Sequence, residues 1–162
     1  MPSDFEPIGH TDIDLLNESL KKAREYARGD TSEEKLTAIL LLVNHVEYVA
    51  SDILRNLHRM IKVGTYEKFN GVISWPISEC MKKKTLGGMI ADLQEFNFPD
   101  REEFIRCLSA FNKKRNKLMH RLLESPSLEV SALEAIIQDF DNIFHRYRSI
   151  KQELLTKWPR IS

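Results

Sequence analysis

Cysteine, glycine and proline are scarce in this chain, which has 2, 6 and 6 of them among 162 residues. Cys80 and Cys107 form no CxxC pair, and two cysteines in a chain of this length do not suggest a disulfide framework. We therefore expect both to be ordinary reduced thiols. Because glycine and proline are few and 42% of the residues are hydrophobic, we expect one domain with a substantial core, spanning residues 1–162.

Long apolar runs are missing as well. No run approaches the roughly 20 residues that a bilayer-spanning helix needs. The opening residues, MPSDFEPIGH, lack the basic and then apolar pattern of a signal peptide. We expect a soluble, cytoplasmic protein with no membrane partner.

An excess of one charge is also absent, since 24 basic residues balance 24 acidic ones. Overall charge therefore gives no hint of a nucleic-acid partner. The distribution is uneven, because residues 1–34 carry nine acids and four bases, whereas Arg106–Arg121 carries six bases and no acid. A basic run of this kind is usually a solvated helix face, so its length alone does not establish a binding surface.

The chain has no alternating strand pattern, no repeat and no low-complexity tract, and helical periodicity extends from end to end. This pattern predicts an all-α fold. A first helix is expected after Thr11 and should end at Gly29, because glycine readily adopts the left-handed conformation that stops a helix.

A second helix is predicted to begin at Thr31, where Glu34 supplies the spacing of a capping box, and to run to about Val63. Its segment LTAILLLV is apolar nearly all round, which is typical of a helix buried within a bundle. Residues 64–84 contain Gly64, Gly71 and Pro76, and we expect them to form an irregular excursion.

Two more helices are expected in the second half of the chain before its last segment. A short helix should begin after Thr85, in TLGGMIADLQEF. Asp100 and Glu103 have capping-box spacing, which predicts a longer helix that runs through the basic segment to about Glu124.

A final long helix is predicted to be capped by Ser131 and Glu134. Its apolar residues recur at helical spacing and predict a core stripe formed by Leu133, Ile136, Ile137, Phe140, Ile143, Phe144, Tyr147, Ile150 and Leu154. Four main helices and one short fifth helix, joined mostly by short connections, predict a bundle in which neighbouring helices are antiparallel.

One cation of the basic segment breaks the helical pattern. At about 100° per residue, Arg115 falls inside the apolar arc of its helix. That arc is formed by Phe104, Leu108, Phe111, Leu118, Met119 and Leu122. Four other cations lie on the opposite side and are candidates to bind RNA: Lys113, Lys114, Lys117 and Arg121.

A buried arginine is costly unless it is paired, so Arg115 requires a carboxylate, a cleft or a partner molecule. Glu47, near the apolar arc of the second helix, could form a structural ion pair with it. Asn112 lies toward one edge of the arc that contains Arg115, and Asn116 and His120, four residues apart, form a polar ridge on the same edge.

The arrangement Arg115-Asn116-x-x-x-His120, in RNKLMH, resembles the R-x4-6-H motif of the HEPN superfamily, including the polar residue after the arginine. The motif falls on the penultimate long helix, as it does in that family. The resemblance covers residues 36–158 in architecture and only these six residues in sequence.

The resemblance implies a HEPN-like helical bundle that forms a homodimer, in which two motifs face each other and make one metal-independent endoribonuclease site. Arg115 would hold the scissile phosphate, His120 would move a proton to or from the reacting oxygens, and Asn116 would position them. Guanidinium is a planar, permanently charged phosphate ligand and imidazole titrates near neutral pH, so both residue types suit this chemistry.

Family members of this kind act in stress response, toxin–antitoxin pairs or phage defence, which would make an antitoxin protein a possible partner. Many others have lost activity and serve as helical dimerisation or interaction modules, and this alternative stays open here. No phosphate-binding glycine loop, HExxH motif or zinc-finger spacing occurs, so we expect neither a cofactor nor a metal.

Overall fold

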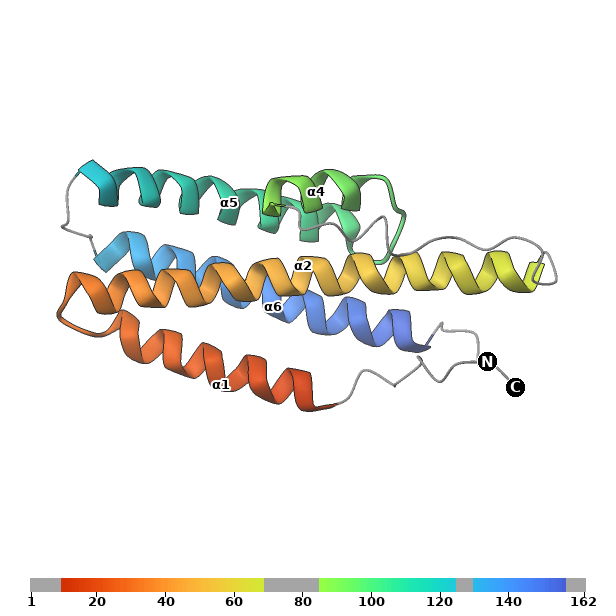
Figure 1. Cartoon of the computed structure of the whole chain (residues 1–162), viewed down its shortest axis with the longest axis horizontal. Coiled ribbons are helices and arrows are strands. Elements are labelled where there is room, and N and C mark those ends of the chain that lie inside the picture. Colours follow the sequence, from red (N-terminus) through yellow and green to blue (C-terminus); the bar gives the residue numbers. More distant parts are fainter. Residues whose placement is uncertain (1–9, 69–84, 125–129, 157–162) are drawn as a thin grey trace.

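The computed structural model describes residues 10–68, 85–124 and 130–156 of the chain. Within these ranges every element is a helix, so the all-α prediction is confirmed. The helices surround a common core (Figure 1). They are α1 (His10–Ala27), α2 (Ser32–Lys68), α4 (Leu86–Gln94), α5 (Arg101–Glu124) and α6 (Val130–Thr156).

Helix α2 forms the centre of the bundle, with contacts to α1, α4, α5 and α6. Its LTAILLLV segment contributes Ala38, Ile39 and Leu42 to the core, as its apolar character predicts. The segment Ser32–Gly64 is long and apolar enough to cross a membrane, by length and composition alone. Core helices of soluble proteins meet the same two criteria. In this fold the segment packs against four other helices.

The predicted capping box at the start of α2 is present. The Glu34 amide donates to Thr31 Oγ1 at 3.2 Å, and the Thr31 amide donates to Glu34 Oε2 at 3.1 Å. Two hydrogen bonds from Thr31 lower the pKa of Glu34. The bond from the Thr31 amide has the larger effect, and the bond from the Thr31 hydroxyl has the next largest. The box therefore contributes stability at neutral pH, and this contribution is lost as the pH falls through the pKa of the folded-state carboxyl. A Cβ atom at position 29 would collide with the Glu34 side chain, so a larger residue there would require this side chain to move. Gly29 does not adopt the left-handed conformation that was expected of it.

The prediction of a short helix after Thr85 is also confirmed. Thr85 is the N-cap of α4, and its hydroxyl accepts a bond from the Gly88 amide at 3.3 Å. The helix packs by its apolar face on α2 and α5, burying Leu86, Met89, Ile90 and Leu93.

Two predicted helix boundaries and one predicted capping box were wrong. Helix α2 continues to Lys68, so residues 64–68 do not belong to an irregular excursion, and residues 69–84 lie outside the described part of the chain. Helix α6 begins at Val130, which places Ser131 inside the helix. Asp100 has a φ of 57° and its carboxylate accepts a 2.6 Å bond from Arg146 of α6, while Glu103 binds Arg106. Arginines therefore engage both carboxylates of the expected capping box.

The core stripe predicted for α6 is confirmed. All of its predicted members are buried except Ile137, which is partly buried. Phe140 and Phe144 stack with ring centroids 5.9 Å apart, and Phe144 and Tyr147 stack at 6.1 Å. This stripe holds α6 against α2 and α5 and fixes the position of the helix that carries the motif.

Candidate functional site

The candidate site lies where α5 approaches the N-terminal half of α2. Arg115 reaches across from α5, and its Nη1 atom lies 3.4 Å from Oε1 of Glu47 on α2. The structure thus brings together the two residues predicted to form an ion pair. The contact is long for a bond between charged groups, which are usually 2.7–2.9 Å apart.

Both partners of this ion pair keep access to solvent. The side chain of Arg115 is 25% exposed and that of Glu47 is 34% exposed. The apolar neighbours of Arg115 along α5, Phe111 and Leu118, are buried. The Arg115 side chain therefore extends from the core to the solvent-exposed edge of the contact between α2 and α5. A guanidinium has a planar fork that matches both carboxylate and phosphate, so this side chain suits either ligand.

Asn116 and His120 are exposed on α5, and within the described residues neither has a bonding partner. On a helix, five residues correspond to a rotation of about 140° and an axial rise of about 7.5 Å. Arg115 and His120 therefore leave the helix in different directions. A reaction centre that used both groups would need a second surface to bring them together.

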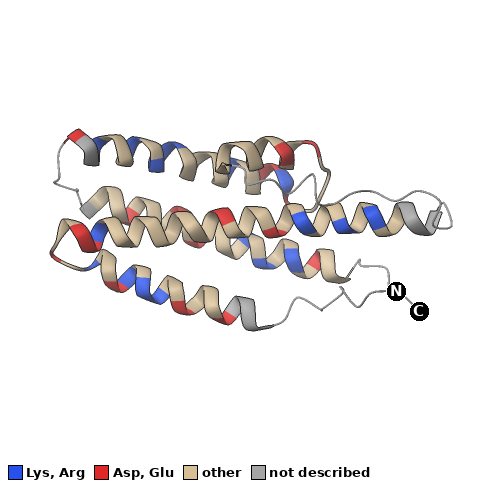
Figure 2. Cartoon of the chain, in the orientation of Figure 1, with Lys and Arg blue, Asp and Glu red and all other residues tan. Residues whose placement is uncertain are grey.

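The predicted RNA-binding cations divide into two groups. The Nζ atom of Lys114 lies 2.8 Å from Oδ2 of Asp139, which places this lysine in an ion pair between α5 and α6. The other three are exposed and have no carboxylate partner in the described part of the chain. They are Lys113, Lys117 and Arg121, and together they make α5 rich in basic residues (Figure 2).

Asn112 is half-buried and lies beside the start of α4. Its Nδ2 atom is 3.8 Å from the position that a Cβ atom on Gly87 would occupy. The structural role near Arg115 that the sequence suggests for Asn112 stays a prediction.

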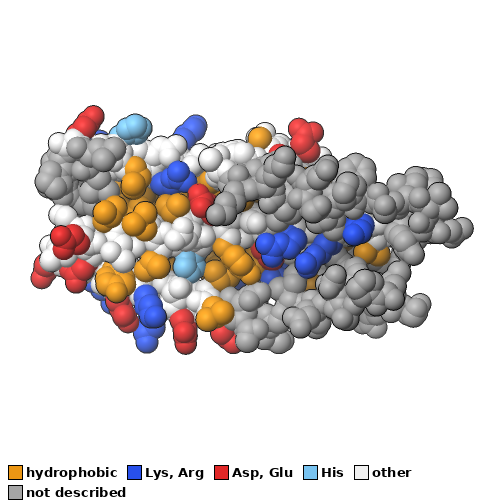
Figure 3. All heavy atoms as spheres, viewed as in Figure 1, with side chains coloured by type: hydrophobic (Ala, Val, Ile, Leu, Met, Phe, Trp, Pro, Cys, Tyr) orange, Lys and Arg blue, Asp and Glu red, His pale blue; other side chains and the backbone are white. Residues whose placement is uncertain are grey.

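An apolar strip borders the Arg115–Glu47 pair. On α2, Leu36, Leu40 and Val43 precede Glu47 at helical spacing, and Leu40 remains 47% exposed. Figure 3 shows hydrophobic side chains gathered on the face of the bundle where α2 lies in front, with charged groups between them.

A buried polar cluster between α2 and α6 was not predicted from the sequence. The Lys151 amine of α6 donates to Asp52 Oδ2 at 3.1 Å and to the Tyr147 hydroxyl at 3.0 Å, and that hydroxyl donates to Asp52 at 2.8 Å. Asn56 adds a 2.8 Å bond from Nδ2 to the main-chain carbonyl of Asp52. Asp52 is 1% exposed and Lys151 is 5% exposed, so this ion pair is far more deeply buried than the pair at Arg115.

Within the described residues, no group of three or more His, Cys, Asp or Glu side chains could hold a metal ion. No protein-family model matches the chain, and neither a curated protein nor a solved structure matches it. The motif residues and their surroundings are therefore the features from which a function can be inferred.

Proposed function

We propose that this protein is a HEPN-type, metal-independent endoribonuclease whose site forms between two copies of the chain. The observation that best supports this function is the position of Arg115, which leaves an apolar helix face and stays partly open to solvent. Two exposed members of the same motif, Asn116 and His120, lie further along α5. The proposal includes a bundle with antiparallel neighbours, a cytoplasmic location, and a role in stress response, toxin–antitoxin function or phage defence.

Each motif residue has a distinct role in the proposed reaction. Arg115 binds the scissile phosphate and stabilises the charge that develops on it. His120 transfers a proton to or from the 2′-oxygen or the leaving oxygen, and Asn116 orients these groups. Lys113, Lys117 and Arg121 supply the sequence-independent attraction to the RNA backbone.

The geometry of one helix supports the two-copy arrangement. Because Arg115 and His120 diverge by about 140° around α5, one copy does not direct both at the same phosphate. In an isologous dimer the same surface patch of both copies forms the interface. If that patch includes the motif, Arg115 of one copy approaches His120 of the other. The apolar strip next to Glu47 supplies surface for such a contact.

The full-length protein is expected to be a dimer at micromolar concentration, as measured by light scattering. Leu40→Asp should convert it to a monomer, because it places a charge in the centre of the apolar strip. Leu155, which is 50% exposed on α6, provides the matched control, and Leu155→Asp should leave the dimer intact. A monomeric wild-type protein would count heavily against the two-copy site.

His120→Ala is expected to reduce the rate of RNA cleavage by about 10²–10⁴-fold while RNA affinity stays nearly unchanged, since a general acid or base acts in the chemical step. Single-turnover cleavage of a labelled RNA and a filter-binding assay measure the two quantities. His145→Ala is the matched control, because His145 is an exposed histidine on α6 outside the motif.

Cleavage should proceed in EDTA at the rate measured without it. If EDTA abolished cleavage and magnesium restored it, the reaction would depend on a metal ion and the HEPN mechanism would be excluded.

Equal cleavage rates for His120→Ala and the wild type would show that His120 takes no part in the reaction.

A second function, a non-catalytic helical interaction module, is favoured by the Arg115–Glu47 ion pair itself. In this alternative the arginine is permanently engaged by the carboxylate, and the apolar strip binds a partner protein such as an antitoxin. The absence of cleavage in every RNA tested, with a stable dimer, would support this alternative.

A further inference from the structure

A second basic surface lies on the C-terminal half of α2. Residues 53–66 contain Arg55, Arg59 and Lys62 and no acidic residue. Positions four and seven residues after Arg55 return to nearly the same side of a helix, so these three side chains leave α2 along one line of about 10.5 Å. We call this line the α2 basic stripe. In Figure 3 Lys and Arg side chains gather over this half of α2.

The charges of the stripe have no counter-ion within the described residues. None of its three cations forms an ion pair or a side-chain hydrogen bond there. Asp52, three residues before Arg55, is the nearest carboxylate along the helix, and it is bound to Lys151 and to the Tyr147 hydroxyl. Cations three and four residues apart on a helix repel each other. The stripe therefore keeps positive charge at the surface that no described carboxylate compensates.

The side chains of the stripe are partly held in place. Arg55, Arg59 and Lys62 are each half-buried, whereas Lys21 and Lys22 on α1 are exposed. A half-buried cation packs its hydrocarbon stem on the protein surface and keeps its charged end in water. Less side-chain freedom is then lost when a ligand binds to it.

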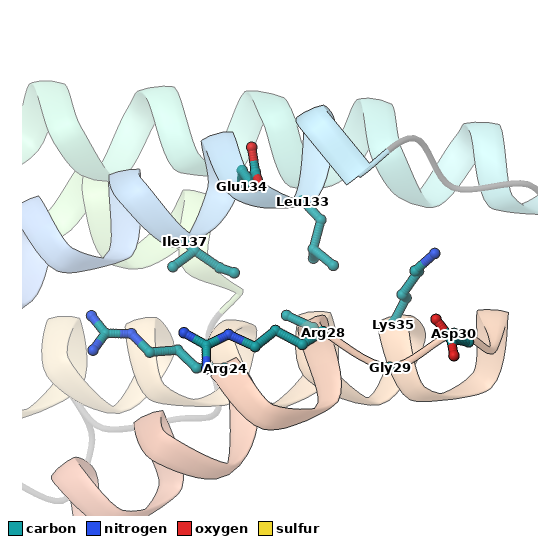
Figure 4. A pocket seen from close by; sticks show the side chains of 9 residues that line it. Arg24, Arg28, Gly29, Asp30, Lys35, Leu133, Glu134 and Ile137 are labelled. Atoms are coloured by element: carbon teal, nitrogen blue, oxygen red, sulfur yellow. The ribbon is translucent and has the colours of Figure 1, made fainter.

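The cations at the turn between α1 and α2 have a different arrangement. They line a cavity of about 360 Å³ together with the facing side of α6. In Figure 4 Arg28 and Lys35 extend toward opposite ends of this cavity. Arg24 is paired with Asp141, with Nη2 2.6 Å from Oδ1. These side chains do not form a line along one helix, as the α2 basic stripe does.

The arrangement of the stripe favours a linear polyanion over a single small anion. A row of charges matches successive phosphates of a nucleic-acid backbone, and neutralising phosphates is the main sequence-independent source of affinity. An anionic membrane is a poorer match. A helix that binds a membrane surface inserts its apolar face, whereas the apolar residues of this half of α2, Ile53, Leu54 and Leu57, are buried in the bundle.

We propose that the α2 basic stripe binds the phosphate backbone of single-stranded RNA. The choice of RNA rests on the function proposed above, but the stripe is not part of the motif on α5. Arg55 lies eight residues after Glu47, about 12 Å further along α2. A strand held by the stripe therefore has its neighbouring nucleotides within reach of Arg115, the partner of Glu47. The stripe adds affinity and takes no part in the chemical step.

Fluorescence anisotropy with a short labelled oligouridylate measures this contribution. The variant Arg55→Gln/Arg59→Gln/Lys62→Gln of the full chain should bind the RNA at least about tenfold more weakly than the wild type at about 50 mM salt. The slope of log affinity against log salt should decrease in magnitude by about 2, since each phosphate neutralised on a single strand contributes about 0.7. Each single variant should decrease it by about 0.7, which provides a second measure of the effect.

Lys21→Gln/Lys22→Gln/Arg28→Gln is the matched control. It removes three exposed cations from α1 and the turn after it, so the change in net charge is the same. The control should leave the salt slope unchanged, because these cations do not lie on the stripe. Thermal unfolding without RNA checks that each variant is folded.

Single-turnover cleavage at saturating RNA separates this proposal from the ribonuclease proposal. The triple variant of the stripe should cleave at the wild-type rate once RNA is saturating, because the motif residues are unchanged. If the wild type cleaves no RNA but the triple variant loses RNA affinity, the ribonuclease proposal fails and the stripe stands as an RNA-binding surface.

The stripe proposal is overturned if the triple and single variants keep the wild-type affinity and salt slope. It is also overturned if the wild type binds vesicles that contain phosphatidylserine and does not bind oligouridylate. Loss of cleavage at saturating RNA in the folded triple variant would place the stripe in the reaction itself and would likewise contradict the proposal.

Discussion

Replacing Lys151 with methionine is expected to lower the free energy of unfolding by about 3–5 kcal/mol, because the substitution leaves the carboxylate of Asp52 buried without its counter-ion. The Tyr147 hydroxyl still donates to Asp52 in the variant, but a neutral donor does not replace a positive charge. Methionine fits the space of the lysine side chain, so the loss reports on the charge rather than on a cavity. Urea unfolding at neutral pH measures the change.

Arg148→Met provides the matched control, because Arg148 is an exposed cation on the same helix. It should change stability by less than about 0.5 kcal/mol. The double variant Asp52→Leu/Lys151→Met should recover much of the stability lost in the single variant, since a pair of apolar groups needs no counter-ion. A loss below about 1 kcal/mol for Lys151→Met would show that its amine reaches water.

The helix starts that were predicted correctly depend on residues close together in the chain. Thr31 bonds to Glu34 and Thr85 bonds to Gly88. In each case the two residues are only three positions apart, so the local sequence alone identifies the helix start. The cap predicted at Asp100 failed for the opposite reason. Its partner, Arg146, lies 46 residues further along the chain, and no local pattern reveals that the two meet.

The polar contacts between helices show the same limit. Arg115 stood out as a cation within an apolar arc, and that criterion led to Glu47, its observed partner. The same criterion would have found Lys151, which lies four residues after Tyr147 and next to Ile150 in the core stripe of α6. A lysine in the final turns of a helix also suits the negative end of the helix dipole at the surface, so its position alone does not indicate burial.

The degree of burial could not be predicted from periodicity. Arg115 falls inside an apolar arc, yet its side chain is 25% exposed. Lys114 was assigned to the outer face, yet it pairs with Asp139 of α6. Both differences arise from how the neighbouring helices are placed around α5, which depends on the packing of the whole bundle.

Arg115→Ala is expected to lower the free energy of unfolding by no more than about 1 kcal/mol, because ion pairs with this degree of exposure contribute little. If the ribonuclease proposal is correct, the same substitution reduces cleavage by at least about 10²–10³-fold and also weakens RNA binding, since a phosphate ligand acts before and during the reaction. Arg115→Lys should keep part of the affinity and lose most of the rate, because lysine keeps the charge without the planar fork.

Glu47→Gln supplies the decisive comparison, since it removes the carboxylate and leaves Arg115 positively charged. If Arg115 binds phosphate, the Glu47 carboxylate and the RNA phosphate compete for its guanidinium group. Glu47→Gln should then raise RNA affinity, and Arg115→Ala should lower it. If the pair only joins α2 to α5, both variants should lose the same small amount of stability and neither should change RNA binding. Opposite effects on affinity identify a phosphate site, whereas matching stability losses in a protein that cleaves no RNA identify an interaction module.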